Sequence, residues 1–117
     1  MSPKGVGLVL VSVVLVGCGQ VLFKASAAQW RLDAGLWVAM RSLLSPTFVA
    51  ALAIYAIATM LWVYALRLVP LSMAYPLYAL AFLLVPILAH YFAGEPLTGN
   101  TLIGGAVIVA GVAIAIR

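Results

Sequence analysis

The chain has 117 residues, of which 68% are hydrophobic and only 7% are charged, and its formal net charge is +4. A soluble domain carries about 25% charged residues, so this sequence has too little polar surface to cover a water-soluble globule. Its six basic residues are spread along the chain, which argues against a nucleic-acid-binding patch and favours contacts with anionic lipid head groups. The composition predicts an integral membrane protein that sits in a phospholipid membrane.

Charged residues and turn signals divide the chain into apolar segments at residues 5–28, 47–66, 71–92 and 101–116. Each approaches the roughly 20 residues that a helix needs to cross the hydrocarbon core. Ser45 and Pro46 precede the second segment and suit the N-cap and the first position of a helix. We expect an all-α membrane protein in which four transmembrane helices form a single domain over residues 1–117.

The connection between the first two segments contains a short amphipathic pattern. Its apolar residues fall on one stripe of a helix: Leu36, Trp37, Met40, Leu43 and Leu44. Asp33 precedes this stripe as a candidate N-cap. The pattern predicts an interfacial helix with its aromatic side towards the lipid, the alternative being an ordinary loop.

Basic residues near the segment ends do not favour one orientation. With four crossings, Lys4, Arg67 and Arg117 share one side of the membrane. Lys24, Arg31 and Arg41 share the other side, which gives three against three. The positive-inside bias is therefore absent, and either the small numbers tie by chance or the chain inserts both ways and pairs with an inverted copy.

Short motifs in the last two segments resemble those of the drug/metabolite transporter superfamily in its four-helix form. In the small multidrug resistance branch, residues matching Pro70, Ala74 and Tyr75 open the third helix. That branch also carries two glycines on the dimerisation face of the fourth helix, with the spacing of Gly104 and Gly111. The resemblance implies a small-multidrug-resistance-like fold that works as a dimer.

The chain departs from the small multidrug pumps at the residue that couples drug export to protons. Aligning Lys24 with the lysine of their first helix places their essential Glu at Val16, and their Gly-x-Gly hinge falls at Leu80 and Phe82. Without an embedded carboxylate there is no obvious group to exchange a proton for a cation. A small-molecule or cation exporter of this type is therefore the weaker interpretation.

The better match is to the EamA-like subunits proposed to flip 4-amino-4-deoxy-L-arabinose-phosphoundecaprenol. They share Gly19, Gln20 and Lys24 in the first helix and the run Ala74–Pro76 in the third. This resemblance implies a multi-pass protein of the bacterial inner membrane that flips a polyprenyl-phosphate-linked sugar. It would act as a homodimer, parallel or antiparallel, or as a heterodimer with a sister subunit. A non-transporting membrane accessory protein is a further alternative.

Gln20 and Lys24 lie one helical turn apart near the end of the first apolar segment. At head-group depth, Lys24 would neutralise a lipid phosphate and Gln20 would bond phosphate or sugar oxygens. The structural alternatives are a lysine that extends its stem to the head groups and a glutamine bonded to a neighbouring helix. Gly17 and Gly19 would let a lipid or another helix approach the backbone.

The third apolar segment supplies the other predicted substrate-binding residues. Pro76 and Pro86 each remove a backbone hydrogen bond, and the first of these releases the carbonyl of Ser72. The hydroxyls of Tyr75 and Tyr78, with that carbonyl, would face an amino sugar. The alternative is that these tyrosines belong to an interfacial aromatic belt, as we expect for Tyr55, Tyr91 and Trp30. Trp62 is expected to be an anchor near the end of the second segment.

We expect no enzyme activity, cofactor, metal or nucleic-acid partner. The sequence contains no cluster of cysteines and histidines, no nucleophile triad and no phosphate-binding loop. Glu95 is expected to organise the turn before the last segment, with pairing to a basic residue as the alternative, and His90 is expected to be interfacial.

Overall fold

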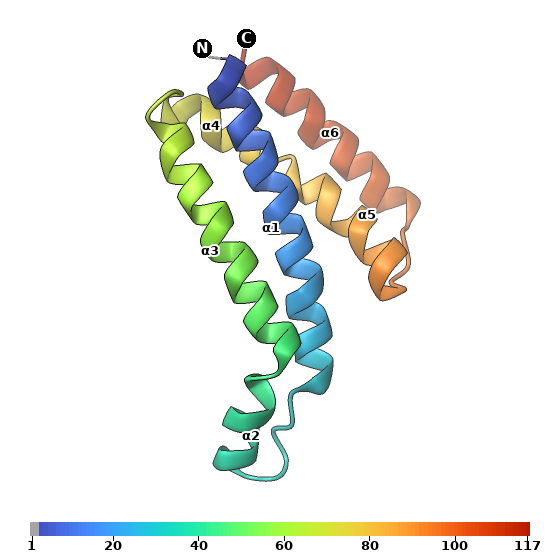
Figure 1. Ribbon diagram of the computed structural model, residues 1–117. Helices are drawn as coiled ribbons and strands as arrows, with labels where there is room; N and C mark the ends of the chain where they lie inside the picture. Colours follow the sequence, from blue (N-terminus) through green and yellow to red (C-terminus); the bar gives the residue numbers. More distant parts are fainter. Residues whose placement is uncertain (1–2) are drawn as a thin grey trace.

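The computed structural model describes residues 3–117, and this part of the chain is helical and contains no strand (Figure 1). Its helices are α1 (Pro3–Gln29), α2 (Leu36–Leu43), α3 (Pro46–Leu66), α4 (Leu71–Tyr78), α5 (Ala81–Ala93) and α6 (Gly99–Ala115). Among these residues, α1, α3 and the stretch Leu71–Ala93 are long and apolar enough to cross a membrane, and α6 is a shorter apolar helix. The predicted all-α membrane fold with four transmembrane segments is confirmed.

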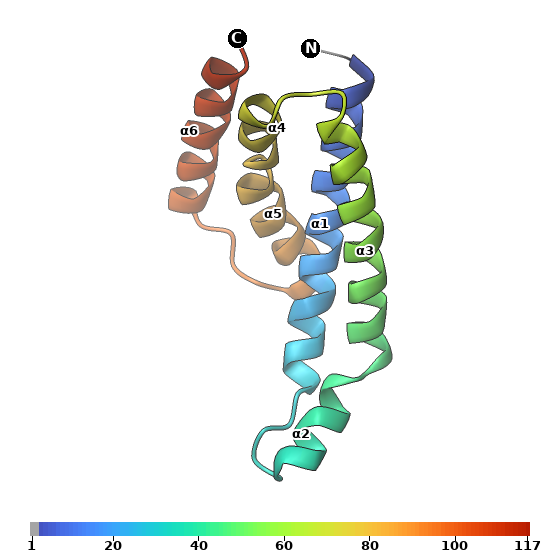
Figure 2. The ribbon, with the colours of Figure 1, turned by 90° about the vertical axis from the view of Figure 1, so that its left-hand side faces the viewer.

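The long helices run side by side. α1 packs against α3 on one side and against α4 and α5 on another, and α6 packs against α4 and α5. Figures 1 and 2 show both chain ends and the α3–α4 connection at one end of the molecule, with α2 at the opposite end. The basic residues at the two chain ends and in the α3–α4 connection therefore lie together, as an even number of crossings requires.

The third transmembrane segment is one apolar span, Leu71–Ala93, which is interrupted between α4 and α5. α4 ends at Tyr78 and α5 begins at Ala81, and tight turns join them. The amide of Leu80 donates to the carbonyl of Leu77 at 3.1 Å, and the amide of Phe82 donates to the carbonyl of Ala79 at 2.9 Å. Pro76 cannot donate a backbone hydrogen bond, which weakens the helix just before this break, whereas Pro86 lies inside α5.

Two of the predicted helix starts can be compared with the structure. Ser45 caps α3 as predicted, because its side-chain oxygen accepts from the amide of Phe48 at 3.3 Å. The helix predicted from the apolar stripe Leu36–Leu44 forms as α2, but Asp33 is not its N-cap. Gly35 occupies that position with a φ of 103°, a conformation that favours glycine.

The core consists mainly of small residues: Val9, Val13, Ala65, Val69, Ala74, Leu77, Ala81 and Val112. Small side chains allow helices to approach closely, which is how helices associate where lipid removes the hydrophobic drive. A Cβ at Gly105 would collide with the side chain of Leu83 on α5. Glycine at this position therefore allows α6 to pack closely against α5. Many large apolar side chains point outwards instead, as a hydrocarbon solvent permits.

Candidate functional site

Four residues of α1 follow one another at intervals of four positions, about one helical turn each. They are Ser12, Val16, Gln20 and Lys24. Residues at this spacing are neighbours on a helix surface, although the row turns gradually around the axis. Gln20 and Lys24 were predicted from the sequence as site residues. Ser12 was not predicted as a site residue. Its position two turns before Gln20 in the same series could have indicated it.

Gln20 is bonded to the neighbouring helix. Its side-chain amide donates to the hydroxyl of Tyr55 on α3. Gly19 makes this contact possible, because a Cβ there would lie only 2.7 Å from the ring of Tyr55. Phe23 also packs against that ring, with a centroid separation of 5.0 Å. The interhelical hydrogen bond expected as the structural role of Gln20 is present, and Gly19 admits a helix rather than a lipid.

Lys24 is paired with Glu95 in the turn between α5 and α6. Its ammonium nitrogen lies 3.7 Å from a carboxylate oxygen, and the two side chains are 61% and 44% exposed. The backbone of Glu95 is held in the turn, since its amide donates to the carbonyl of Ala89 at 3.2 Å. Its carbonyl oxygen lies 2.8 Å from Nδ1 of His90. Glu95 therefore has both of its predicted roles.

A groove of about 330 Å³ runs between α1 and α5. Its lining residues are Val16, Gln20, Tyr78, Ala81, Phe82, Val85 and Pro86. Only Gln20 and Tyr78 contribute polar side chains to this lining, and both were predicted as site residues. Phe82 is 67% exposed, so the groove borders the outer, lipid-facing surface of the helices.

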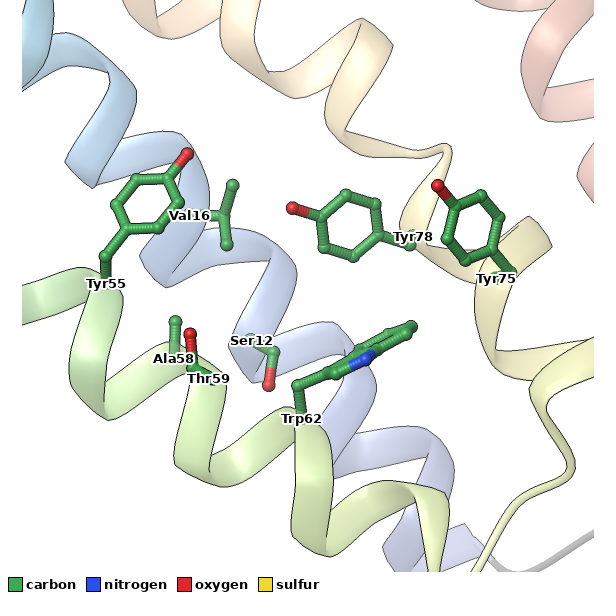
Figure 3. Close-up of a pocket in the computed structure, with 8 residues that line it drawn as sticks. All are labelled: Ser12, Val16, Tyr55, Ala58, Thr59, Trp62, Tyr75 and Tyr78. Carbon is green, nitrogen blue, oxygen red and sulfur yellow. The ribbon is translucent and has the colours of Figure 1, made fainter.

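A second hollow of about 270 Å³ lies further along α1 (Figure 3). Its lining residues are Ser12, Val16, Tyr55, Ala58, Thr59, Trp62, Tyr75 and Tyr78. Val16 and Tyr78 line both hollows, so the groove and this cavity adjoin. Val16 is also the position at which the small multidrug pumps place their acidic residue, and a valine there has no proton to exchange.

Three aromatic side chains form one wall of the cavity. The ring of Trp62 lies edge-on to that of Tyr78, with centroids 5.2 Å apart and an interplanar angle of 71°. Tyr75 and Tyr78 are stacked at 6.1 Å. Figure 3 shows the hydroxyl of Tyr78 pointing from α4 towards α1. Trp62, expected as an interfacial anchor, instead packs against the two predicted tyrosines.

Ser72 lies apart from these residues. It is exposed near the start of α4 and lines neither the groove nor the cavity. The structure thus brings Gln20, Tyr75 and Tyr78 to two adjoining hollows, places Lys24 one turn beyond Gln20, and leaves the side chain of Ser72 outside both.

The arrangement offers hydrogen-bonding groups, aromatic faces and one cation along a row that follows a membrane-spanning helix. Residues 3–117 contain no group of histidine, cysteine and acidic side chains that could hold a metal ion. Polar groups within a spanning segment usually mark a substrate path. The fold and these hollows define a multi-pass membrane protein of the transporter class.

The chain belongs to the EamA-like transporter family, whose family model matches residues 5–117. It is similar to the probable 4-amino-4-deoxy-L-arabinose-phosphoundecaprenol flippase subunit ArnE of Pseudomonas paraeruginosa, with 37% identity over 92% of each chain. The protein of the same name from Aeromonas hydrophila is 35% identical, over 87% of this chain and 90% of its own. No solved structure matches the chain significantly.

Proposed function

We propose that this protein is a subunit of a flippase that moves a polyprenyl-phosphate-linked amino sugar across the bacterial inner membrane. The names of its relatives, which cover most of the chain, support this substrate class. The observation that carries the proposal is the groove between α1 and α5, where Gln20 and Tyr78 line one hollow a single turn from Lys24. A phosphate and the sugar attached to it require such neighbouring charged and neutral groups.

Lys24 binds the lipid phosphate as a point charge, after exchanging its present partner Glu95. Gln20 bonds phosphate or sugar oxygens with the hydrogen-bonding capacity that Tyr55 leaves free. As the head group moves along α1, the hydroxyl of Tyr78 and then that of Tyr75 bond the sugar. The carbonyl of Ser72 contributes only if α4 moves, since Ser72 lines neither hollow.

The polyprenyl tail remains in the hydrocarbon while the head group follows the groove. The exposed ring of Phe82 at the groove edge supports this division between lipid-facing and polar surfaces. Moving a phosphate through hydrocarbon without compensating groups would carry a large desolvation cost. The row on α1 offers such groups at intervals of one turn.

The working unit is a dimer that contains a second copy of this chain, parallel or antiparallel, or a sister subunit. Gly104 and Gly111 on α6 support this assembly, because a Cβ at either position would meet nothing within 4 Å. Their surface is therefore open to a second helix, which small residues allow to approach closely. Closed two-fold pairs are the commonest oligomers.

Two other functions compete with this proposal. A small-molecule or cation exporter of the small multidrug type would draw support from the aromatic wall of the cavity. Val16, which lines both hollows, offers no carboxylate for proton coupling. A non-transporting accessory protein would need only the open face of α6.

The test is reconstitution of the purified protein, alone and with a candidate sister subunit, in liposomes that contain a labelled polyprenyl-phosphate amino sugar. We expect the label to move between leaflets without a proton gradient. Movement of a cationic dye that requires a proton gradient would favour the exporter instead. If the protein moves neither compound, the result would favour a non-transporting accessory protein.

A further inference from the structure

Ser12 is a buried serine whose hydroxyl the fold leaves unused. Its side chain is 1% exposed, and its Oγ has no hydrogen-bond partner among residues 3–117. Buried polar groups are nearly always paired, so this one needs an explanation. Ser26 on the same helix provides the contrast, because its Oγ donates to the carbonyl of Leu22 at 2.9 Å.

Ser12 is one of the residues that line the aromatic cavity (Figure 3). Thr59 on α3 supplies a hydroxyl, and the rings of Trp62 and Tyr78 supply apolar faces inclined to each other by 71°. The cavity holds about 270 Å³. One water molecule needs only about 10–15 Å³ on this measure, so the space accepts a small organic group.

The Ser12 end of the cavity is too far from Lys24 to be reached by a sugar whose phosphate stays on that lysine. Ser12 and Lys24 are twelve residues apart on α1, which is roughly 18 Å at the rise of an α-helix. A sugar whose phosphate contacts Lys24 reaches Gln20 and Tyr78, but it does not span this length. The cavity is therefore a separate position along the same row.

We propose that the cavity is a second head-group site, which holds the amino-sugar ring after its phosphate has left Lys24. This inference rests on the proposed function and deepens it. Ser12 and Thr59 hydrogen-bond sugar hydroxyls, and Trp62 and Tyr78 contact the apolar face of the ring and its ammonium group. Aromatic faces attract such cations, most strongly when water is excluded.

Trp62 provides a direct reporter for this site. The chain has three tryptophans, so Trp30→Phe and Trp37→Phe leave Trp62 as the single tryptophan, which can be excited apart from the tyrosines. We expect the methyl glycoside of 4-amino-4-deoxy-L-arabinose to change Trp62 fluorescence saturably in the purified full-length protein. Polyprenyl phosphate without a sugar should bind but leave this signal unchanged, which separates the sugar site from the phosphate site.

Ser12→Ala and Thr59→Val should each weaken glycoside binding about three- to tenfold, as expected for one neutral hydrogen bond. Ser26→Ala is the matched control and should not. Because the Ser12 hydroxyl has no partner, Ser12→Ala should not lower the unfolding temperature, whereas removal of a structural serine would. Absence of a Trp62 response, or equal effects of Ser12→Ala and Ser26→Ala, would overturn the proposal.

The lipid assay separates failure of this inference from failure of the proposed function. If the glycoside binds in a Ser12-dependent manner but the protein moves no lipid-linked sugar, the site stands and the flippase proposal fails. If Ser12→Ala moves the lipid-linked sugar at the unmodified rate and Trp62 does not respond, the flippase proposal stands and this site is wrong.

Discussion

The ammonium of Lys24 on α1 and the carboxylate of Glu95 in the α5–α6 turn form an ion pair with a separation of 3.7 Å. Both side chains are largely exposed, and such pairs stabilise a fold by only about 0.2–1 kcal/mol. The pair therefore matters less for stability than for binding. A lipid phosphate that approaches Lys24 has to compete with Glu95 for the same ammonium.

Removing this competitor should strengthen phosphate binding. We expect Glu95→Gln to bind polyprenyl phosphate about 1.5- to fivefold more tightly, which corresponds to the weak energy of an exposed pair. Binding is measured on protein in lipid nanodiscs with a labelled ligand. Asp33→Asn changes the net charge by the same amount in the loop before α2 and serves as the control. Equal affinities of the two variants would mean that Glu95 does not compete.

Removing the cation should have the opposite effect. We expect Lys24→Met to abolish flipping of the labelled lipid-linked sugar, while Lys24→Arg retains part of the activity because a guanidinium binds phosphate with a different reach. Gln20→Leu should reduce flipping less, since it removes a neutral hydrogen bond worth about 0.5–1.5 kcal/mol. Each rate is normalised to folded protein. Full activity of Lys24→Met would mean that Lys24 extends its ammonium to the membrane head groups and does not bind the phosphate of the substrate.

Assembly should depend on the open glycines of α6. Gly104→Leu or Gly111→Leu should convert dimers into monomers in mild detergent, because a larger side chain prevents close approach of a second helix. Gly7→Leu on α1 is the control, since that position is also open. Cross-linking yields report the result, and unchanged yields in both α6 variants would exclude this face as the interface.

The sequence predicted the helices better than the breaks between them. Apolar length is sufficient to place α1, α3 and α6, and the Ser45–Pro46 pair marks a helix start by local chemistry. The break after Tyr78 was missed because a proline inside an apolar run is compatible with a kink or a break, and packing decides between them. Asp33 was chosen as a cap by residue type, but a glycine with positive φ takes that position.

The sequence predicted the candidate site as two groups of residues, each within one element: Gln20 and Lys24 on α1, and Tyr75 and Tyr78 on α4. Gln20 and Lys24 were recognised together because they are one turn apart in the chain. The partners Tyr55 and Glu95 come from other elements, and no local pattern connects them to α1. Ser12 is an unremarkable residue in sequence, and its unpaired hydroxyl becomes apparent only when the cavity is seen.

Orientation should respond to added charge. The three-to-three tie of basic residues predicts that a reporter fused to the C-terminus appears on both sides of the membrane. Two lysines inserted after Lys4 should shift nearly all of it to the cytoplasmic side. A reporter confined to one side in the unmodified protein would exclude dual insertion and leave a parallel dimer or a sister subunit.

The contact between Gly19 and Tyr55 should be sensitive to a single methyl group. A Cβ at Gly19 would lie 2.7 Å from the Tyr55 ring, which Phe23 holds in place. We expect Gly19→Ala to destabilise the fold by about 1–3 kcal/mol, the usual cost of overpacking. Thermal unfolding in detergent measures this loss. Gly7→Ala, at an open position, should be neutral or stabilising because alanine favours a helix.

A second variant separates the steric effect from the lost hydrogen bond. Tyr55→Phe keeps the ring and removes the hydroxyl that accepts from Gln20, so it should cost only about 0.5–1.5 kcal/mol. In a Tyr55→Ala background the ring is absent, and Gly19→Ala should then carry no penalty. This double-mutant cycle isolates the contact, because neighbouring residues couple and distant ones do not. If Gly19→Ala were equally destabilising without the ring, the close approach of α1 and α3 would depend on a different contact.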